Sequence, residues 1–197
     1  MARSSAETRT RLLEAAEHLL VREGPSAVGV NAVAAEAGVD KVLIYRYFGG
    51  LPQLLACLSS ERRLWPSMED RAATERSLES ALRLALISLA RDLRADALVR
   101  RASAWELTDD NAMTSELSGA RERETARLLA SLRSRFDTPR YLDTQALLAL
   151  LASGVAYLAT RPAHAPLAFG LDTSSDEDWQ RIQKMTSSII RLLAGSV

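Results

Sequence analysis

Residues 30–48 read VNAVAAEAGVDKVLIYRYF, and this stretch decides the fold. Apolar residues recur in it at helical spacing on both sides of Gly38, which predicts two short helices, roughly Val30 to Ala37 and Asp40 to Tyr47. Glycine tolerates the positive φ that a tight turn between two helices requires. Helices this short cannot bury a core alone, so they must pack on neighbours. The spacing fits a helix-turn-helix.

The packing demands of that motif are met by four further residues. Ala34 is small where the two helices would cross. Val39, Ile44 and Phe48 are spaced to tie the second helix of the motif to a helix that precedes it. A small residue, a glycine and apolar residues at these spacings also occur in helical proteins without a DNA role. The motif alone therefore leaves DNA binding open.

Helical spacing continues outward on both sides of the motif. Upstream, Leu12, Ala16 and Leu20 share one face of a helix that ends at Gly24-Pro25. Downstream, the pattern predicts helices over residues 54–65, 74–94, 96–107, 111–136, 139–160 and 175–195. Residues 162–175 form a longer loop to which the sequence assigns no role. No segment alternates as a strand would, so we predict an all-α fold of about nine helices with no strands.

Composition narrows the class of protein. The chain has 197 residues, of which 47% are hydrophobic, and 25 basic residues balance 25 acidic ones. DNA-binding domains are usually strongly basic, so a net charge of zero argues against such a protein without excluding it. Residues 1–50 carry six basic and six acidic residues. If this part binds DNA, we expect weak non-specific binding and a heavier reliance on sequence-specific contacts.

The sequence also disfavours an enzyme. A single cysteine, Cys57, excludes a disulfide framework and a cysteine-based metal site. The chain contains no HExxH, no GxSxG, no phosphate-binding loop and no histidine cluster. We therefore expect no catalytic residues, no cofactor and no metal. The N-terminal residues form no apolar run and no apolar stretch is long enough to span a bilayer, so we expect a cytoplasmic protein with no membrane contact.

Five short elements run in order through residues 8–55, and together they are more specific than a lone helix-turn-helix. They are Arg11-Leu12-Leu13-Glu14-Ala15-Ala16, Arg22-Glu23-Gly24, Val33-Ala34-Ala35-Glu36-Ala37-Gly38-Val39, Ile44-Tyr45-Arg46-Tyr47-Phe48 and Leu54-Leu55. In order and spacing they resemble the N-terminal domain of the tetracycline-repressor-like (TetR) regulators. The resemblance implies a helix-turn-helix DNA-binding domain over residues 1–50 and a helical ligand-binding and dimerisation domain over residues 51–197.

Three places depart from the family pattern. Val28-Gly29-Val30 stands where the second helix usually begins with Thr or Ser. Val42-Leu43 stands where small residues are usual, and Leu51-Pro52 replaces a usual Lys-Glu pair. These departures keep open an alternative function, a helical partner- or lipophile-binding protein with degenerate DNA contact.

The resemblance also implies which residues meet double-stranded DNA. A recognition helix lies in the major groove and uses its N-terminal side chains on base edges. Lys41 is placed for a guanine edge or a phosphate, and Val42 and Leu43 for thymine methyl groups. The other implied DNA-binding residues are Tyr45, Arg46 and Tyr47 on the recognition helix and Arg9 and Arg11 on the first helix. Tyr45 and Tyr47 could instead be half-buried packing residues, and Arg9 and Arg11 could instead be solvated charges.

Regulation follows from the same resemblance. A homodimer would bind an inverted-repeat operator with recognition helices about 34–36 Å apart. The last two helices are the expected interface, because residues 142–158 are apolar nearly all round and the last helix carries an apolar stripe. A small-molecule effector of unknown identity would bind the larger domain, and we expect a repressor. The expected ligand-binding residues are Trp65, Trp105, Met113 and Tyr157, each of which could instead be plain core.

Overall fold

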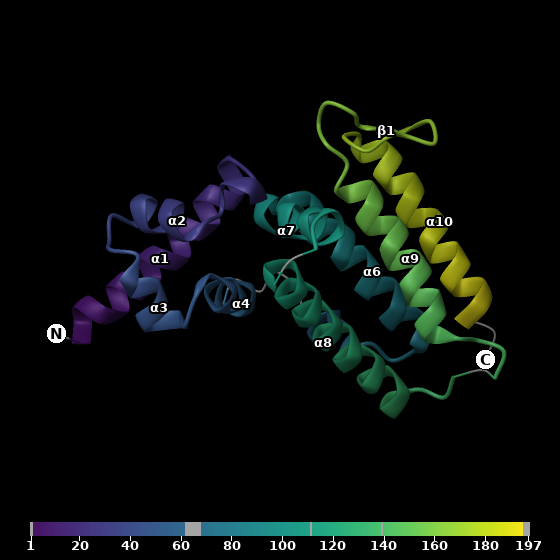
Figure 1. The fold of residues 1–197 in the computed structure, drawn as a ribbon. Coiled ribbons are helices and arrows are strands. Elements are labelled where there is room, and N and C mark those ends of the chain that lie inside the picture. The colour runs from purple at the N-terminus through teal and green to yellow at the C-terminus, as the bar shows by residue number, and fades with distance from the viewer. Residues whose placement is uncertain (1, 62–67, 111, 139, 195–197) are drawn as a thin grey trace. The chain divides into compact units, whose positions relative to one another are not determined.

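The computed structural model describes residues 2–61, 68–110, 112–138 and 140–194 (Figure 1). Within them lie ten α-helices, a short 3-10 helix and one two-stranded hairpin. The chain folds into two compact units. The first unit comprises residues 1–65 and 96–122, and the second comprises residues 66–95 and 123–197. The predicted all-α class is confirmed, and the predicted absence of strands is wrong.

The first unit begins with the helices that the sequence motif predicts. Its elements are α1 (Ala2–Arg22), η1 (Pro25–Ala27), α2 (Val30–Ala37), α3 (Val42–Phe48), α4 (Leu51–Glu61), α7 (Ala97–Thr108) and the first half of α8 (Ala112–Arg135). One hydrophobic cluster joins them, and it includes Leu12, Ile44 and Leu54 from the N-terminal helices. Trp105 of α7 and Leu117 of α8 belong to the same cluster. The core of the helix-turn-helix therefore extends into helices that lie far along the chain.

The second unit is built mostly from longer helices. Its elements are α5 (Met68–Ala72), α6 (Leu78–Ala95), the rest of α8, α9 (Thr144–Ala159), β1 (Leu167–Ala168), β2 (Leu171–Asp172) and α10 (Asp176–Ala194). Leu82 and Leu86 of α6 pack with Leu128 of α8 and Ile190 of α10 in a second cluster. Its helices are amphipathic, so α6 can bury one face among its neighbours.

Capping side chains explain where several helices differ from their predicted bounds. The helix predicted over 74–94 begins later, at Leu78 of α6, where the Ser77 hydroxyl accepts a hydrogen bond from the N–H of Ser80 (3.1 Å); α5, which precedes it, was not predicted. The helix predicted from residue 139 begins at Thr144, where the Asp143 carboxylate accepts from the N–H of Ala146 (2.9 Å). Asp96 caps α7 in the same way. Polar capping residues thus override the apolar periodicity at these boundaries.

The hairpin corrects the prediction that residues 162–175 form only a loop. Leu167 pairs with Asp172 and Ala168 pairs with Leu171 in antiparallel register. Strands of two residues are too short to show the alternation by which a strand is recognised in a sequence.

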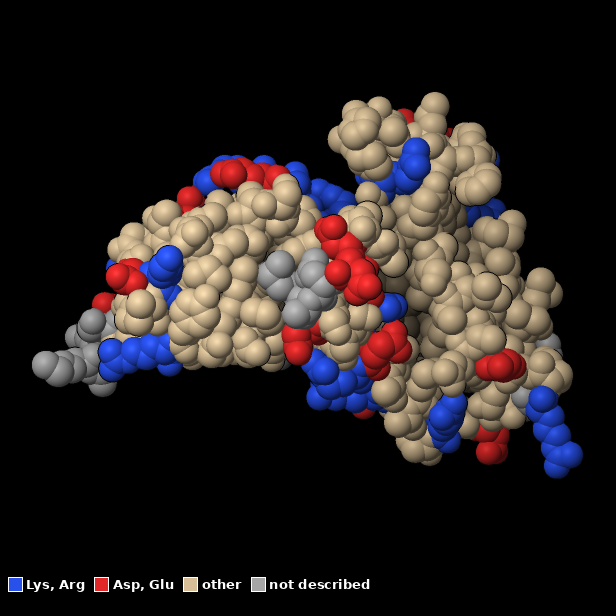
Figure 2. Space-filling model, in the orientation of Figure 1, with Lys and Arg blue, Asp and Glu red and all other residues tan. Residues whose placement is uncertain are grey.

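Charge is scattered over the surface. Figure 2 shows basic and acidic side chains side by side, with wide uncharged areas between them. No helix among the described residues is both long enough and apolar enough to cross a membrane. Across the same residues, no group of three His, Cys, Asp or Glu side chains is placed to hold a metal ion.

Candidate nucleic-acid interface

The turn between α2 and α3 has the geometry that a helix-turn-helix needs. Gly38 ends α2 with φ 63° and ψ 40°, a left-handed conformation that glycine adopts without strain. The N–H of Val39 then donates to the carbonyl of Ala34 (3.0 Å), which closes the helix end. Asp40 follows, and its carboxylate accepts from the N–H of Val42 at 2.8 Å. This turn therefore sets the direction in which α3 leaves α2.

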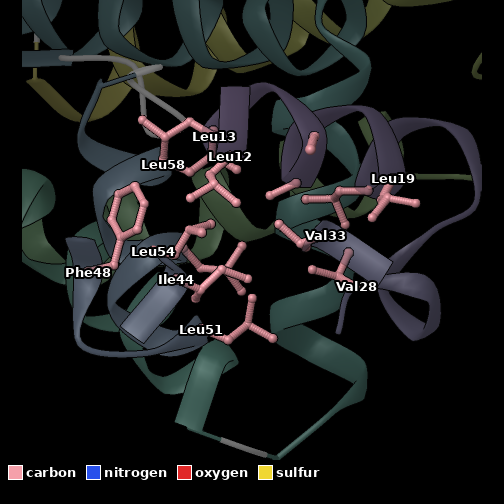
Figure 3. Packing of buried hydrophobic residues seen from close by; sticks show 14 of the residues in the cluster. Leu12, Leu13, Leu19, Val28, Val33, Ile44, Phe48, Leu51, Leu54 and Leu58 are labelled. Carbon is pink, nitrogen blue, oxygen red and sulfur yellow. The ribbon is translucent and has the colours of Figure 1, made fainter. Parts of the chain in front are cut away.

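Two side chains anchor α3 to the core of the first unit. Ile44 is fully buried and Phe48 nearly so, and Figure 3 shows both pointing among leucines of α1 and α4. Leu43 and Tyr47, two predicted DNA contacts, are half-buried against the same cluster. The structure thus gives Leu43 and Tyr47 a packing role, and their contact with DNA stays a prediction.

The remaining side chains of α3 form an exposed face. Lys41 immediately precedes the helix, and Val42, Tyr45 and Arg46 lie on it. Val42 is 61% exposed and Tyr45 is 56% exposed, although both are large apolar or aromatic side chains. We call these four residues the recognition face. It brings together half of the eight predicted DNA-binding residues.

Asn31 is a neighbour of this face that sequence reasoning missed. It is the second residue of α2, it is exposed, and its Oδ1 lies 3.4 Å from Nζ of Lys41. Gly29, which precedes α2, has no side chain with which to cap the helix start. A polar residue in the first turn of an uncapped helix was the available signal, because such helix ends favour anions.

Arg11 holds α1 to the end of α2. Its guanidinium donates through Nη2 to the carbonyl of Ala37, and the same nitrogen lies 3.5 Å from the carbonyl oxygen of Gly38. A Cβ atom at Gly38 would come within 3.2 Å of that nitrogen, so the glycine also makes room for the contact. Arg11 is thereby occupied at the turn of the motif, and its predicted phosphate contact is not tested.

Arg9 ties α1 to α4 and to the end of α3. Its Nη2 lies 2.6 Å from Oε1 of Glu61, and its guanidinium lies over the ring of Phe48 at 5.2 Å. The hydrogen bond with Glu61 raises the pKa of Arg9 further above its ordinary value. Like Arg11, Arg9 has a partner within the first unit, and its contact with DNA stays a prediction.

Two of the four expected effector residues have described side chains, and they belong to different units. Trp105 is buried in the core of the first unit, and Tyr157 is exposed on α9. Met113 lies in α8, but its side chain is outside the described residues, as is all of Trp65. Their role in ligand binding stays a prediction.

The second unit contains a cavity of about 340 Å³ between the end of α8 and the start of α9. Its lining residues are Leu129, Leu132, Arg133, Thr138, Leu142, Asp143, Thr144 and Gln145. Arg133 donates to Oε1 of Gln145 at 3.1 Å. The hydroxyl oxygen of Thr144 is buried without a hydrogen-bond partner among the described residues. Three leucines line the cavity together with five polar or charged residues, so it offers apolar contacts and several hydrogen-bonding groups.

The two last helices present apolar side chains outward. On α9 the exposed residues recur at intervals of three and four, at Ala146, Ala149, Leu150, Ser153, Gly154 and Tyr157. On α10 a second strip contains Ile182, Met185, Ile189 and Leu192, of which Met185 and Leu192 are mostly exposed. Leu150 is 75% exposed. We call these two strips the C-terminal apolar face.

Fold and site together define a helical protein with an N-terminal helix-turn-helix. The family model described as "Bacterial regulatory proteins, tetR family" matches residues 12–56. An uncharacterized HTH-type transcriptional regulator of Mycobacterium tuberculosis H37Rv is 31% identical over 126 residues, which is 63% of this chain and 61% of that relative. Residues 12–56 of the chain therefore match the helix-turn-helix domain of the TetR regulators.

Solved structures share this fold over nearly the whole chain. A TetR family transcription regulator from Marinobacter aquaeolei VT8 is 21% identical, with a TM-score of 0.66 over 95% of this chain and 97% of that one. Bacillus subtilis FadR, solved in complex with stearoyl-CoA, is 18% identical, with a TM-score of 0.61 over 95% and 98%.

Proposed function

We propose that the chain is a DNA-binding transcriptional repressor that binds an inverted-repeat operator as a homodimer and releases it in response to a small effector. The recognition face carries this proposal. A lysine, a valine, a tyrosine and an arginine are exposed together on a helix that Ile44 and Phe48 fix to the core. Exposing the apolar surface of Val42 and Tyr45 to water is unfavourable in free energy, and contact with a DNA groove would remove that surface from water.

Each residue of the recognition face has a distinct role in this proposal. Lys41 donates to a guanine edge, and Val42 contacts a thymine methyl group. Tyr45 and Arg46 reach the sugar-phosphate backbone and fix the register of the helix. Asn31 and the start of α2 offer a further phosphate contact from the neighbouring helix. These roles predict an operator half-site that contains adjacent G·C and A·T pairs.

The C-terminal apolar face supports a homodimer. Leu150, Met185 and Leu192 are large apolar side chains that stay exposed in a single chain. The small, exposed Ser153 and Gly154 on α9 allow a second helix to approach closely. A self-complementary patch of this kind suits a twofold dimer, which places two recognition helices on two half-sites.

The cavity of about 340 Å³ supports an effector site in the second unit. Its volume lies at the lower end of the range for ligand sites, so we expect a compact effector. Arg133, Gln145 and the unsatisfied hydroxyl of Thr144 would bind its polar groups. The stearoyl-CoA of the FadR complex belongs to a relative that shares the fold at 18% identity, and an acyl-CoA is one class to include in a ligand screen.

The test of DNA binding uses the whole chain. Repeated selection from a random duplex pool should enrich an inverted repeat, and fluorescence anisotropy should then show binding to it. The chain offers a matched control, because its only two lysines are Lys41 and Lys184. We expect Lys41→Ala to weaken specific binding by about 1–3 kcal/mol and relax the preferred site, while Lys184→Ala leaves both unchanged. Failure to enrich any sequence at low salt would overturn the proposal.

The homodimer has its own test. Leu150→Glu places a charge on the C-terminal apolar face, and sedimentation should show that it converts a dimer into a monomer. Leu107, which is 74% exposed on α7 of the first unit, provides the control substitution Leu107→Glu. A wild-type protein that sediments as a monomer at high concentration would contradict the homodimer.

A further inference from the structure

The hairpin between α9 and α10 holds an aromatic side chain in an unfavourable position. Its two-residue loop is Phe169-Gly170, and both residues have positive φ, 52° and 77°. A tight hairpin with positive φ at both loop positions is a type I′ turn, which favours Asn, Asp or Gly at the first position. A bulky side chain there is strained. Phe169 is the only such non-glycine residue among those that the structure describes.

The hairpin also exposes that side chain almost completely. Phe169 is 94% exposed, and Leu167 beside it is mostly exposed. Apart from Arg161, residues 161–171 carry no acidic or basic side chain other than His164. A strained, exposed and uncharged tip is unfavourable for an isolated chain in water. Features of this kind persist where a partner compensates for them.

The tip is held rigidly from within the second unit. Arg161 donates to the carbonyls of Ala165 and Leu167, at 3.1 Å each. The Thr173 hydroxyl donates to the carbonyl of Pro166 at 2.9 Å, and the buried Trp179 donates through Nε1 to the carbonyl of Thr173 at 2.8 Å. The hairpin is therefore preorganised, so binding through its tip costs little further ordering of the chain.

The same arginine connects the hairpin with the C-terminal apolar face. Arg161 lies over the ring of Tyr157 at 5.7 Å and donates through Nη1 to its hydroxyl oxygen at 3.3 Å. Tyr157 is the last exposed residue of the strip on α9. Figure 1 shows the hairpin at the end of the α9–α10 pair, next to the C-terminal end of α9. The tip thus continues the apolar face beyond the helices.

We propose that the hairpin is a docking arm, and that Phe169 inserts against the apolar surface of a second copy of this chain. This inference rests on the proposed homodimer and extends its interface beyond the two helices. A twofold dimer repeats each contact, so each copy would both donate one Phe169 and receive one. Exposed aromatic side chains that become fully enclosed at an interface are the side chains that dominate its affinity.

The first test separates the ring from the turn. Phe169→Asn removes the ring but supplies the residue that a type I′ turn prefers, so the hairpin should fold at least as well. We expect the dimer dissociation constant, measured by sedimentation or mass photometry, to rise by at least about tenfold, because two aromatic contacts are lost per dimer. Leu107→Ala, at an exposed leucine of the first unit, should leave it unchanged.

The outcomes of this test are distinguishable. A monomeric wild-type protein would remove the homodimer and the docking arm together. A dimeric wild-type protein whose dissociation constant is the same in Phe169→Asn would overturn the docking arm alone. Circular dichroism and thermal unfolding of the variant show that any weakening does not come from misfolding.

A second test reports the contact directly. Replacing Phe169 by the photoreactive p-benzoylphenylalanine and mixing two differently tagged copies should give a covalent product that contains both tags. Peptide mapping should place the cross-link in the second unit of the other copy. Cross-links confined to one chain, or none between copies under conditions where the protein is dimeric, would overturn the proposal.

Discussion

Arg11→Ala distinguishes a residue that builds the helix-turn-helix from one that touches DNA. The Arg11 guanidinium donates to the carbonyl of Ala37 at the end of α2, 3.5 Å from the carbonyl oxygen of Gly38. Carbonyls at a helix C-terminus carry partial negative charge and favour a cation. Hydrogen bonds to charged groups contribute about 1.5–3 kcal/mol, and Arg11 is exposed, so we expect the free energy of unfolding to fall by about 1 kcal/mol.

Measurements of stability and of operator binding test this prediction. Urea unfolding gives the loss of stability, and hydrogen exchange at the amides of Gly38 and Val39 shows whether the turn opens more often. Operator affinity measured over a range of salt concentrations gives the number of phosphate contacts. A residue that only supports the turn leaves the salt dependence unchanged, whereas loss of one phosphate contact lowers its slope by about 0.9.

The reasoning fails if Arg11→Ala keeps full stability and amide protection while the salt slope falls by about one. Arg11→Lys is the matched control, because lysine keeps the charge but lacks the forked guanidinium. We expect Lys to restore only part of the lost stability. Full recovery would mean that charge alone, and not the hydrogen bond to Ala37, stabilises the turn.

Three further predictions follow from single contacts. Arg9→Ala and Glu61→Ala should lower the free energy of unfolding by similar amounts, and a double-mutant cycle should give a coupling energy of about 0.2–1 kcal/mol. Additive effects would show that the two side chains do not interact. Leu43→Ala should cost about 1–2 kcal/mol of stability in thermal unfolding, while Val42→Ala should stay within about 0.5 kcal/mol and weaken operator binding instead. A backbone hydrogen bond from β2 lowers the pKa of Asp178. The ionised Asp178 carboxylate therefore stabilises the fold fully above the ordinary Asp pKa, and this stabilisation is lost as the pH falls through the lowered pKa. An NMR titration that gives Asp178 an ordinary pKa would contradict this.

Local signals in the sequence were sufficient for the helix-turn-helix. The predicted helix from Val30 to Ala37 has the observed bounds of α2, because glycines stand on both sides of it. Gly38 ends that helix with the left-handed conformation expected of it, and Ile44 is fully buried as its spacing predicts. Each of these properties depends on residues only a few positions apart.

Contacts between distant residues could not be predicted in this way. Arg11 and Ala37 are separated by 26 positions, so no local pattern in the sequence reports that the side chain of one binds the carbonyl of the other. The boundary predicted at residue 50 relies on local sequence alone, whereas packing groups residues 96–122 with the N-terminal helices. The hairpin was missed because its strands are too short, and because phenylalanine is not the usual residue for its turn.

The division of the chain limits how the helix-turn-helix can be exchanged between proteins. The chain leaves the first unit after residue 65 and returns to it at residue 96. Leu98, Ala102 and Trp105 then complete the hydrophobic cluster that Leu12 and Ile44 begin. A chimera that transplanted residues 1–50 alone would join half of one core to the complementary half of another. If the protein binds DNA as proposed, engineering a new operator preference calls for exposed substitutions on α3, or for a graft in two segments that carries α7 with it.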